Sequence, residues 1–176
     1  MSTLFIMDAA NLFVGDDDPT KGEYLALKSV KLPDLKEITK EHQGGGAGMG
    51  LSFGLRIIEK PEFSFKLEGI NLRTMTKFMP GVPTNYTVRG NVRDLKNLTN
   101  IPALAVVRGK MQSMSMSEFS RDAGIESDYM IGEITSYILT IGGVEKYALD
   151  YFSGVAGIRV DGQPIFSQVA TNLGLI

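Results

Sequence analysis

The 176-residue sequence contains no cysteine, no tryptophan and a single histidine. The absence of cysteine excludes disulfides, thiolate metal sites and cysteine nucleophiles, and it fits a protein made in a reducing cytoplasm. The lone histidine, His42, lies beside a glycine-rich segment and lacks the partner ligands that a zinc site needs. No run of about 18 apolar residues and no basic stretch before the N-terminal apolar patch is present, so we expect neither secretion nor membrane anchoring.

Catalytic motifs are missing as well. A Ser-His-Asp arrangement would have to use His42, and no G-x-S-x-G turn occurs. Carboxylates that could pair for glycoside chemistry are Glu118, Asp122, Glu126, Asp128 and Glu133. Because no aromatic platform for a sugar is evident, a solvated acidic loop between two strands is the favoured interpretation. We therefore expect no enzyme, and we predict no catalytic residue, no cofactor and no metal site.

The residues from Leu32 to Gly50 form the most unusual segment that is present. A strand-like stretch runs into five glycines, Gly44, Gly45, Gly46, Gly48 and Gly50. A phosphate-binding loop would need a Gly-Lys-Ser/Thr ending or G-x-G-x-x-G spacing, and neither occurs here. Two interpretations remain: a surface hairpin tip, or an arm at about residues 40–50 that becomes ordered against a neighbouring copy.

Hydrophobic periodicity predicts a single, mainly β domain over residues 1–176 with one short helix. Asn71 is expected to cap that helix, which places Leu72, Met75 and Met79 on one stripe and ends at Pro80 and Gly81. Strands are expected at 24–38 with a break near Pro33, 63–68, 86–93, 103–116, 128–141 and 144–150, with shorter extended pieces ending at 162 and at the C-terminal NLGLI.

Two of the expected strands have special patterns. The alternation of 103–116 slips in phase, which indicates a bulge or a strand that leaves the body of the domain. The stretch 128–141 is apolar on both parities, so both of its faces should be covered. Long strands of this kind aggregate unless they close into a barrel or pair in a controlled assembly, so we expect self-association.

Charge is unevenly distributed although the formal net charge is only −2. Residues 56–110 are rich in basic side chains and residues 111–133 in acidic ones. This distribution fits either a solvated surface with uneven loops or acidic and basic faces that meet between copies.

Five local motifs, in order along almost the whole chain, resemble the major tail tube proteins of contractile-tailed bacteriophages and of R-type pyocin particles. They are Asn11-Leu12-Phe13-Val14, Leu32-Pro33-Asp34-Leu35 with Gly45-Gly46-Ala47-Gly48-Met49, Val107-Arg108-Gly109-Lys110, the strand pair from Tyr137 to Asp150, and Asn172-Leu173-Gly174-Leu175. The sequence departs from the family at 16–23, which is longer than usual, and at 111–117, which is usually charged.

The resemblance implies an antiparallel sandwich or barrel-like domain whose strands join into one continuous barrel in a hexameric ring. Stacked rings would form the inner tail tube, which conducts DNA into the host and has no catalytic activity. Implied partners are other copies of the chain, the contractile sheath, baseplate and tail terminator proteins, and the tape measure protein and transiting DNA in the lumen. The particle would be a virion assembled in the host cytoplasm.

Three hypotheses about residues follow from combining this resemblance with the patterns. Gly44, Gly45, Gly46, Gly48 and Met49 would contact the adjacent ring. The five carboxylates named above would belong to the lumen or to an acidic loop. Arg89 and Arg93 would contact another subunit or the sheath. The alternatives are a tube protein of a type VI secretion-like or headless pyocin-like particle and a monomeric β-sandwich binding module.

Overall fold

The chain is described here from a computed structural model that covers residues 3–15, 18–46, 48–79 and 81–175. Its strands are β1 (Phe5–Val14), β2 (Leu27–Lys31), β3 (Glu37–His42), β4 (Leu51–Ile58), β5 (Phe63–Glu68), β6 (Thr84–Asp94), β7 (Thr99–Met116), β8 (Glu126–Ile141), β9 (Val144–Asp150), β10 (Arg159–Val160) and β11 (Gln163–Pro164). Its helical segments are α1 (Leu72–Met75), α2 (Ser167–Asn172) and the 3-10 segments η1 (Pro19–Lys21) and η2 (Tyr151–Gly157). The expectation of a mainly β fold is confirmed.

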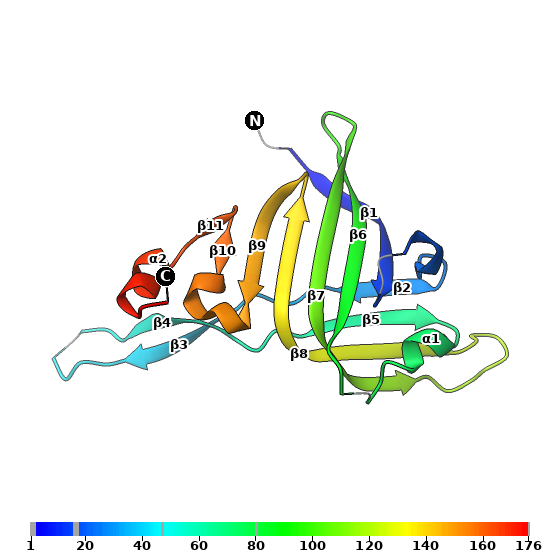
Figure 1. Ribbon diagram of the computed structural model, residues 1–176, viewed down its shortest axis with the longest axis horizontal. Coiled ribbons are helices and arrows are strands. Elements are labelled where there is room, and N and C mark those ends of the chain that lie inside the picture. Colours follow the sequence, from blue (N-terminus) through cyan, green and yellow to red (C-terminus); the bar gives the residue numbers. More distant parts are fainter. Residues whose placement is uncertain (1–2, 16–17, 47, 80, 176) are drawn as a thin grey trace.

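The strands form two layers that share their two longest members. The upper layer has the order β1-β6-β7-β8-β9-β10-β11, and every neighbouring pair in it is antiparallel. β8 also pairs with β5, which pairs with β2, and these pairings are antiparallel too. In Figure 1 the upper layer stands over a lower layer that contains β2, β5 and the far ends of β7 and β8.

The bend that passes β7 and β8 from one layer to the other lies at two bulges. The β7–β8 register shifts between Arg108 and Lys110 and again between Met111 and Ser113. The backbones are so close here that a side chain on Gly109 would place its Cβ 2.7 Å from the carbonyl oxygen of Gly132. The phase slip in the sequence is therefore a pair of bulges, as the first of the two expectations proposed.

The hydrophobic core lies between the layers. Phe65 stacks on Tyr129 with ring centroids 4.9 Å apart, and Tyr86 of the upper layer contacts Phe63 and Phe65. The clean alternation at 63–68 is confirmed, because Phe63, Phe65 and Leu67 are buried while the residues between them face outward.

β8 differs from the expectation that both of its faces are covered. Tyr129, Ile131 and Tyr137 are fully buried on one parity, but Met130 and Ile138 on the other are only half-buried. Among the described residues, the second face of β8 is therefore covered less completely than expected.

The start of α1 agrees with the prediction from the sequence, whereas its end does not. The Asn71 side chain accepts a hydrogen bond from the Thr74 backbone N–H at 2.9 Å and caps α1, as predicted. The predicted apolar stripe is wrong, because α1 ends at Met75 and both Leu72 and Met79 are exposed. Pro80, expected to end the helix, and Ala47 of the glycine segment lie outside the described residues.

The C-terminal segment is the second departure. We expected NLGLI, residues 172–176, to be extended, but Asn172 ends the helix α2, which buries Ala170, and Leu173 and Gly174 form a turn. The single expected helix is thus joined by α2 and by η1 and η2. Across the described residues, no helix is both long enough and apolar enough to cross a membrane.

Turn predictions are confirmed where glycine adopts the left-handed region. Gly142 and Gly143 have φ of 62° and 78° and join β8 to β9, as a two-residue hairpin turn requires. The expected break near Pro33 in the stretch 24–38 is confirmed, because an irregular segment that contains Pro33 separates β2 from β3.

A two-stranded arm projects from the body. β3 and β4 pair with each other and form a sheet separate from both layers (Figure 1). The sequence analysis placed the glycine segment correctly at the arm's tip but did not predict β4. The arm is therefore a hairpin of residues 37–58 rather than a bare loop.

Candidate functional site

The arm is amphipathic, although neither of its faces is buried. The register pairs Lys40 with Phe53 and His42 with Leu51, so these four side chains share one face, which we call the apolar arm face. The other face pairs Thr39 with Gly54 and Glu41 with Ser52 and is polar. Every residue from Leu51 to Ile57 is exposed, in a strand whose pattern is that of a half-buried one.

The tip of the arm is open on all sides. A Cβ added to Gly45, Gly46 or Gly48 would have no atom within 4 Å, and Met49 is 77% exposed. The five predicted inter-ring residues are thus brought together in one turn, with Gly44 and Met49 at its ends. The turn encloses no ligand cradle, because it has no side chain or second backbone segment facing it.

The root of the arm contains a β-bulge that was not predicted from the sequence. Between the pairs Glu37–Ile58 and Thr39–Gly54 the register shifts, which leaves an excess of residues on β4. Arg56 in this bulge has φ of 61°, and its backbone N–H donates to the Glu37 carboxylate at 2.7 Å. The Arg56 guanidinium also lies 5.8 Å from the ring centroid of Phe166, beside α2. A side chain at Gly54 would place its Cβ 2.3 Å from the Glu37 carboxylate, so this glycine is the one sign of the bulge in the local sequence.

The outward face of the lower layer is polar and rich in small side chains. The register aligns Lys66 with Asp128 and Ser115, and Ser64 with Met130 and Ser113. Because paired residues of neighbouring strands point to the same side, these groups form one surface opposite the core. We call it the serine face.

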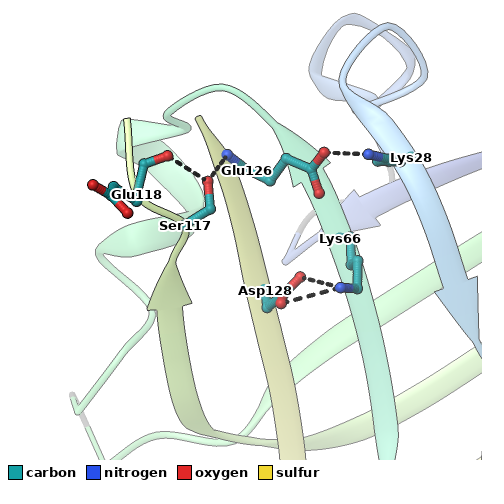
Figure 2. Close-up of polar contacts among 6 residues, drawn as sticks. All are labelled: Lys28, Lys66, Ser117, Glu118, Glu126 and Asp128. Atoms are coloured by element: carbon teal, nitrogen blue, oxygen red, sulfur yellow. Dashed lines mark hydrogen bonds and ion pairs between the residues drawn. The ribbon is translucent and has the colours of Figure 1, made fainter. Parts of the chain in front are cut away.

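The predicted acidic residues do not form one cluster, and most of them are neutralised. Glu126 makes an ion pair with Lys28, and Asp128 lies 3.1 Å from Lys66 (Figure 2). Glu133, at the bend of β8, lies 2.7 Å from Lys110. The hydrogen bond from Lys28 to Glu126 raises the pKa of that lysine.

The remaining acidic residues lie in the turn between β7 and β8. Glu118 and Asp122 are exposed there, and neither has an ion-pair partner among the described residues. Ser117 holds the base of this turn, because its hydroxyl accepts from the Glu126 N–H at 2.9 Å and lies near the Glu118 carbonyl in Figure 2. Of the five predicted acidic residues, Glu118 and Asp122 in this turn are therefore the two without an ion pair among the described residues.

Two strand edges of the lower layer have no neighbour within the described part of the chain. β2 pairs only with β5. The second half of β7, from Met111 to Met116, pairs with β8 on one side and makes a single isolated bridge, Met111 to Phe78, on the other. Exposed edges present unpaired N–H and C=O groups that can pair with another chain.

The two predicted arginine contacts lie on the outer face of the upper layer. Arg93 is 3.7 Å from Asp8 of the same chain, and the Arg89 guanidinium lies 5.9 Å from the ring centroid of Phe13. Arg108, which the sequence analysis did not single out, shares this face because it pairs with Asn85, four residues before Arg89. Three arginines thus share this side, which we call the basic face, and Arg93 is offset there by Asp8.

An apolar groove of about 300 Å³ lies where the arm leaves the body. Its walls come from the arm root, from β8 and β9, and from η2, and include Ile57, Ile58, Ile134, Tyr137, Leu149 and Val155. Burial raises the pKa of Tyr137 to about 12, which reflects the low polarity beside it. No group of three or more His, Asp or Glu side chains that could hold a metal occurs in the described residues. The groove is mainly apolar, and its charged lining residues are Arg56 and Asp150.

Comparison with known proteins identifies the family. A search of the curated proteins gave no match. The family model described as Phage tail tube protein FII matches residues 6–174, which is nearly the whole chain and includes the arm and both layers. This match also agrees with the resemblance carried by the five local motifs. The chain therefore belongs to the phage tail tube protein FII family, and it is a non-enzymatic structural subunit of a phage tail tube.

Proposed function

We propose that six copies join edge to edge through their lower layers and that the resulting continuous barrel is the wall of the tail tube. The observation that carries this proposal is the pair of free edges, β2 and the second half of β7. Since β2, β5, β8 and β7 are successively antiparallel, the two edge strands run in opposite directions. Joining β2 of one copy to β7 of the next continues the antiparallel order and removes both edges.

The serine face would then line the lumen, through which DNA passes and which the tape measure protein fills beforehand. Double-stranded DNA binds tightly to surfaces whose lysines and arginines release its counterions. On the serine face Lys28 and Lys66 are already paired with carboxylates, and the positions around them are small hydroxyls. Such a wall has little net charge with which to retain phosphates.

The basic face around Arg89, Arg93 and Arg108 would point away from the lumen, toward the sheath. A sheath surface with complementary acidic groups would align on it and would set register more than affinity. Baseplate and tail terminator proteins would meet the two ends of the tube, where one ring lacks a neighbour.

The arm would reach the adjacent ring, with Gly44, Gly45, Gly46, Gly48 and Met49 at the contact. Changing Gly46 and Gly48 to valine tests this, because both positions are open and the free subunit has room for the side chains. We expect folded subunits with an unchanged circular dichroism spectrum that fail to form tubes in electron micrographs. Tubes of normal length would contradict the assignment of the arm to the ring-to-ring contact.

Hydrogen–deuterium exchange tests the edge pairing directly. Peptides that cover 27–31 and 111–116 should exchange fast in free subunits and become protected in tubes, because their unpaired N–H groups find partners. The central strand β6 is the control, since it is paired on both sides in a single copy and should be protected in both states. Edges that stay unprotected in tubes would overturn this proposal.

Added positive charge tests the assignment of the lumen. Lysine at Ser113 and Ser115 should make tubes retain short double-stranded DNA at low salt and release it at high salt. A matched variant, with lysine at Asn85 on the basic outer face, should not change what the lumen retains. DNA retention is measured after nuclease has removed DNA bound outside the tube. Equal retention by both variants would mean that the serine face does not line the lumen.

A further inference from the structure

The groove at the arm root is an apolar site that the subunit cannot fill by itself. Its walls are the side chains of Ile58, Leu149 and Val155 and the others named above, and it opens to the surface. The arm begins at this groove and points away from the body (Figure 1). From Glu37 to Gly45 the arm extends about 26 Å at about 3.3 Å per residue, so the tip of one copy cannot fold back onto its own root.

The tip of the arm has apolar side chains that no described surface of the same subunit is seen to cover. Met49, Leu51 and Phe53 are 77%, 58% and 43% exposed, and β4 pairs only with β3 among the described residues. Apolar side chains grouped at the end of a projecting hairpin are unusual for a protein that acts alone. In a family whose members assemble into tubes, another copy is the partner that is always present.

We propose that the groove of one subunit receives the arm tip of a subunit in the next ring, with Leu51 and Phe53 seated against η2 and β9. This proposal rests on the proposed function, since it requires stacked rings. It adds the receiving surface: the ring-to-ring contact joins the tip of each arm to the root of another arm.

Three observations favour this occupant. The groove wall includes Ile57 and Ile58 of the arm itself, so a tip bound there would contact the arm root of the receiving copy. A tip-to-root contact is heterologous, and repeated along one direction it gives an open-ended stack rather than a closed pair. Lys40, on the apolar arm face, has no ion-pair partner in the described residues, whereas Asp150 lies at the groove.

The absence of cysteine provides a direct test. Cysteines are introduced at Leu51 and Val155, singly and together, and preassembled tubes are treated with a short thiol cross-linker. Both positions tolerate a smaller side chain, because neither is buried in the subunit. The expected result is a ladder of covalent species that extends beyond six subunits on a denaturing gel, for the double variant only.

The control pairs the cysteine at Leu51 with one at Leu98. Leu98 is as exposed as the tip, but it lies in the turn between β6 and β7, so this pair should give no ladder. A ladder that stops at six would show that the tip binds within its own ring, and tubes without any cross-link would show that the groove is not the receiving site. Either result overturns the inference and leaves the tube function intact, whereas failure of the parent protein to form tubes would remove the proposed function itself.

Discussion

β4 and β5 follow each other along the chain and have nearly the same alternation of apolar and polar residues, but their environments are opposite. Leu51, Phe53 and Leu55 alternate along β4, and all three are exposed. Phe63, Phe65 and Leu67 alternate along β5, and all are at most 2% exposed. Alternation therefore identifies a strand with one apolar face, but it does not say whether that face is covered by the same chain or by another. In β5 the cover is the upper layer, whereas Leu51, Phe53 and Leu55 of β4 are left exposed by the part of the subunit that the structure describes.

The difference separates stability from assembly. Side chains of β5 should determine the free energy of unfolding of a single subunit, and side chains of β4 should act only when copies meet. The following substitutions test this division in free subunits, at concentrations below those that give tubes.

The largest effect is expected for Phe65→Ala in the body. The ring of Phe65 packs against Tyr129 and Tyr86, so its loss leaves a cavity between the layers. The free energy of unfolding should fall by about 3–5 kcal/mol. Urea denaturation followed by circular dichroism measures this, and a loss below about 1 kcal/mol would mean that the layers are not the source of the stability.

A smaller effect of the opposite sign is expected for Tyr86→Phe. The Tyr86 hydroxyl is buried without a hydrogen-bond partner in the described structure, so its removal should stabilise the subunit by about 1 kcal/mol. Burial raises the pKa of Tyr86 to about 12. The unfolded chain releases this proton at a lower pH, so stability should fall as pH rises above the ordinary tyrosine value.

The same substitution therefore has a signature at high pH. Tyr86→Phe should reduce the loss of stability above about pH 10 without abolishing it, because burial raises the pKa of Tyr137 as well. Thermal melts between neutral and strongly alkaline pH give the comparison. Parallel curves for the two proteins would mean that Tyr86 is ionised in the folded state or has an unseen partner.

A modest effect is expected at the edge of the upper layer, for Glu145→Gln. The Glu145 carboxylate accepts two hydrogen bonds from Arg159, at 2.8 and 2.9 Å, and these lower its pKa. The pair is partly exposed, so its loss should cost less than about 1 kcal/mol at neutral pH. Because a lowered pKa stabilises only the ionised form, the difference between variant and parent should vanish as pH falls through that pKa. A difference that persists in acid would contradict the electrostatic explanation.

The smallest effect on the free subunit is expected for Phe53→Ser in the arm. Its ring is exposed, so the free energy of unfolding should change by less than about 0.5 kcal/mol. Tube formation, followed by sedimentation or electron microscopy, should nevertheless fall sharply. A destabilisation comparable to that of Phe65→Ala would break the comparison between β4 and β5.

The sequence predicted those features that depend on neighbours along the chain. The strand at 63–68, the Asn71 cap, the turn at Gly142 and Gly143 and the bulge in 103–116 all follow from local periodicity and backbone preference. The position of the glycine tip follows for the same reason. The family came from the order of five short motifs, and the family model supports it.

Features that depend on distant partners were not predictable. Glu126 and Asp128 looked like free acids, but each is neutralised by a lysine more than 60 residues away. β4 was missed although its apolar residues alternate from Leu51 to Ile57, and only the bulge at Arg56 depends on a distant partner, Glu37. α2 (Ser167–Asn172) was not predicted, because a helix of six residues has little stability of its own and depends on packing against the rest of the chain. The groove needs four separate segments and has no signature in any of them.

The bend shared by β7 and β8 has a mechanical consequence. The two layers are connected by two continuous strands, of 18 and 16 residues, in addition to the side chains packed between them. A force that pulls the layers apart must therefore stretch covalent backbone as well as open an apolar interface. A tube built from such subunits would pass load between its wall and its exterior along continuous strands.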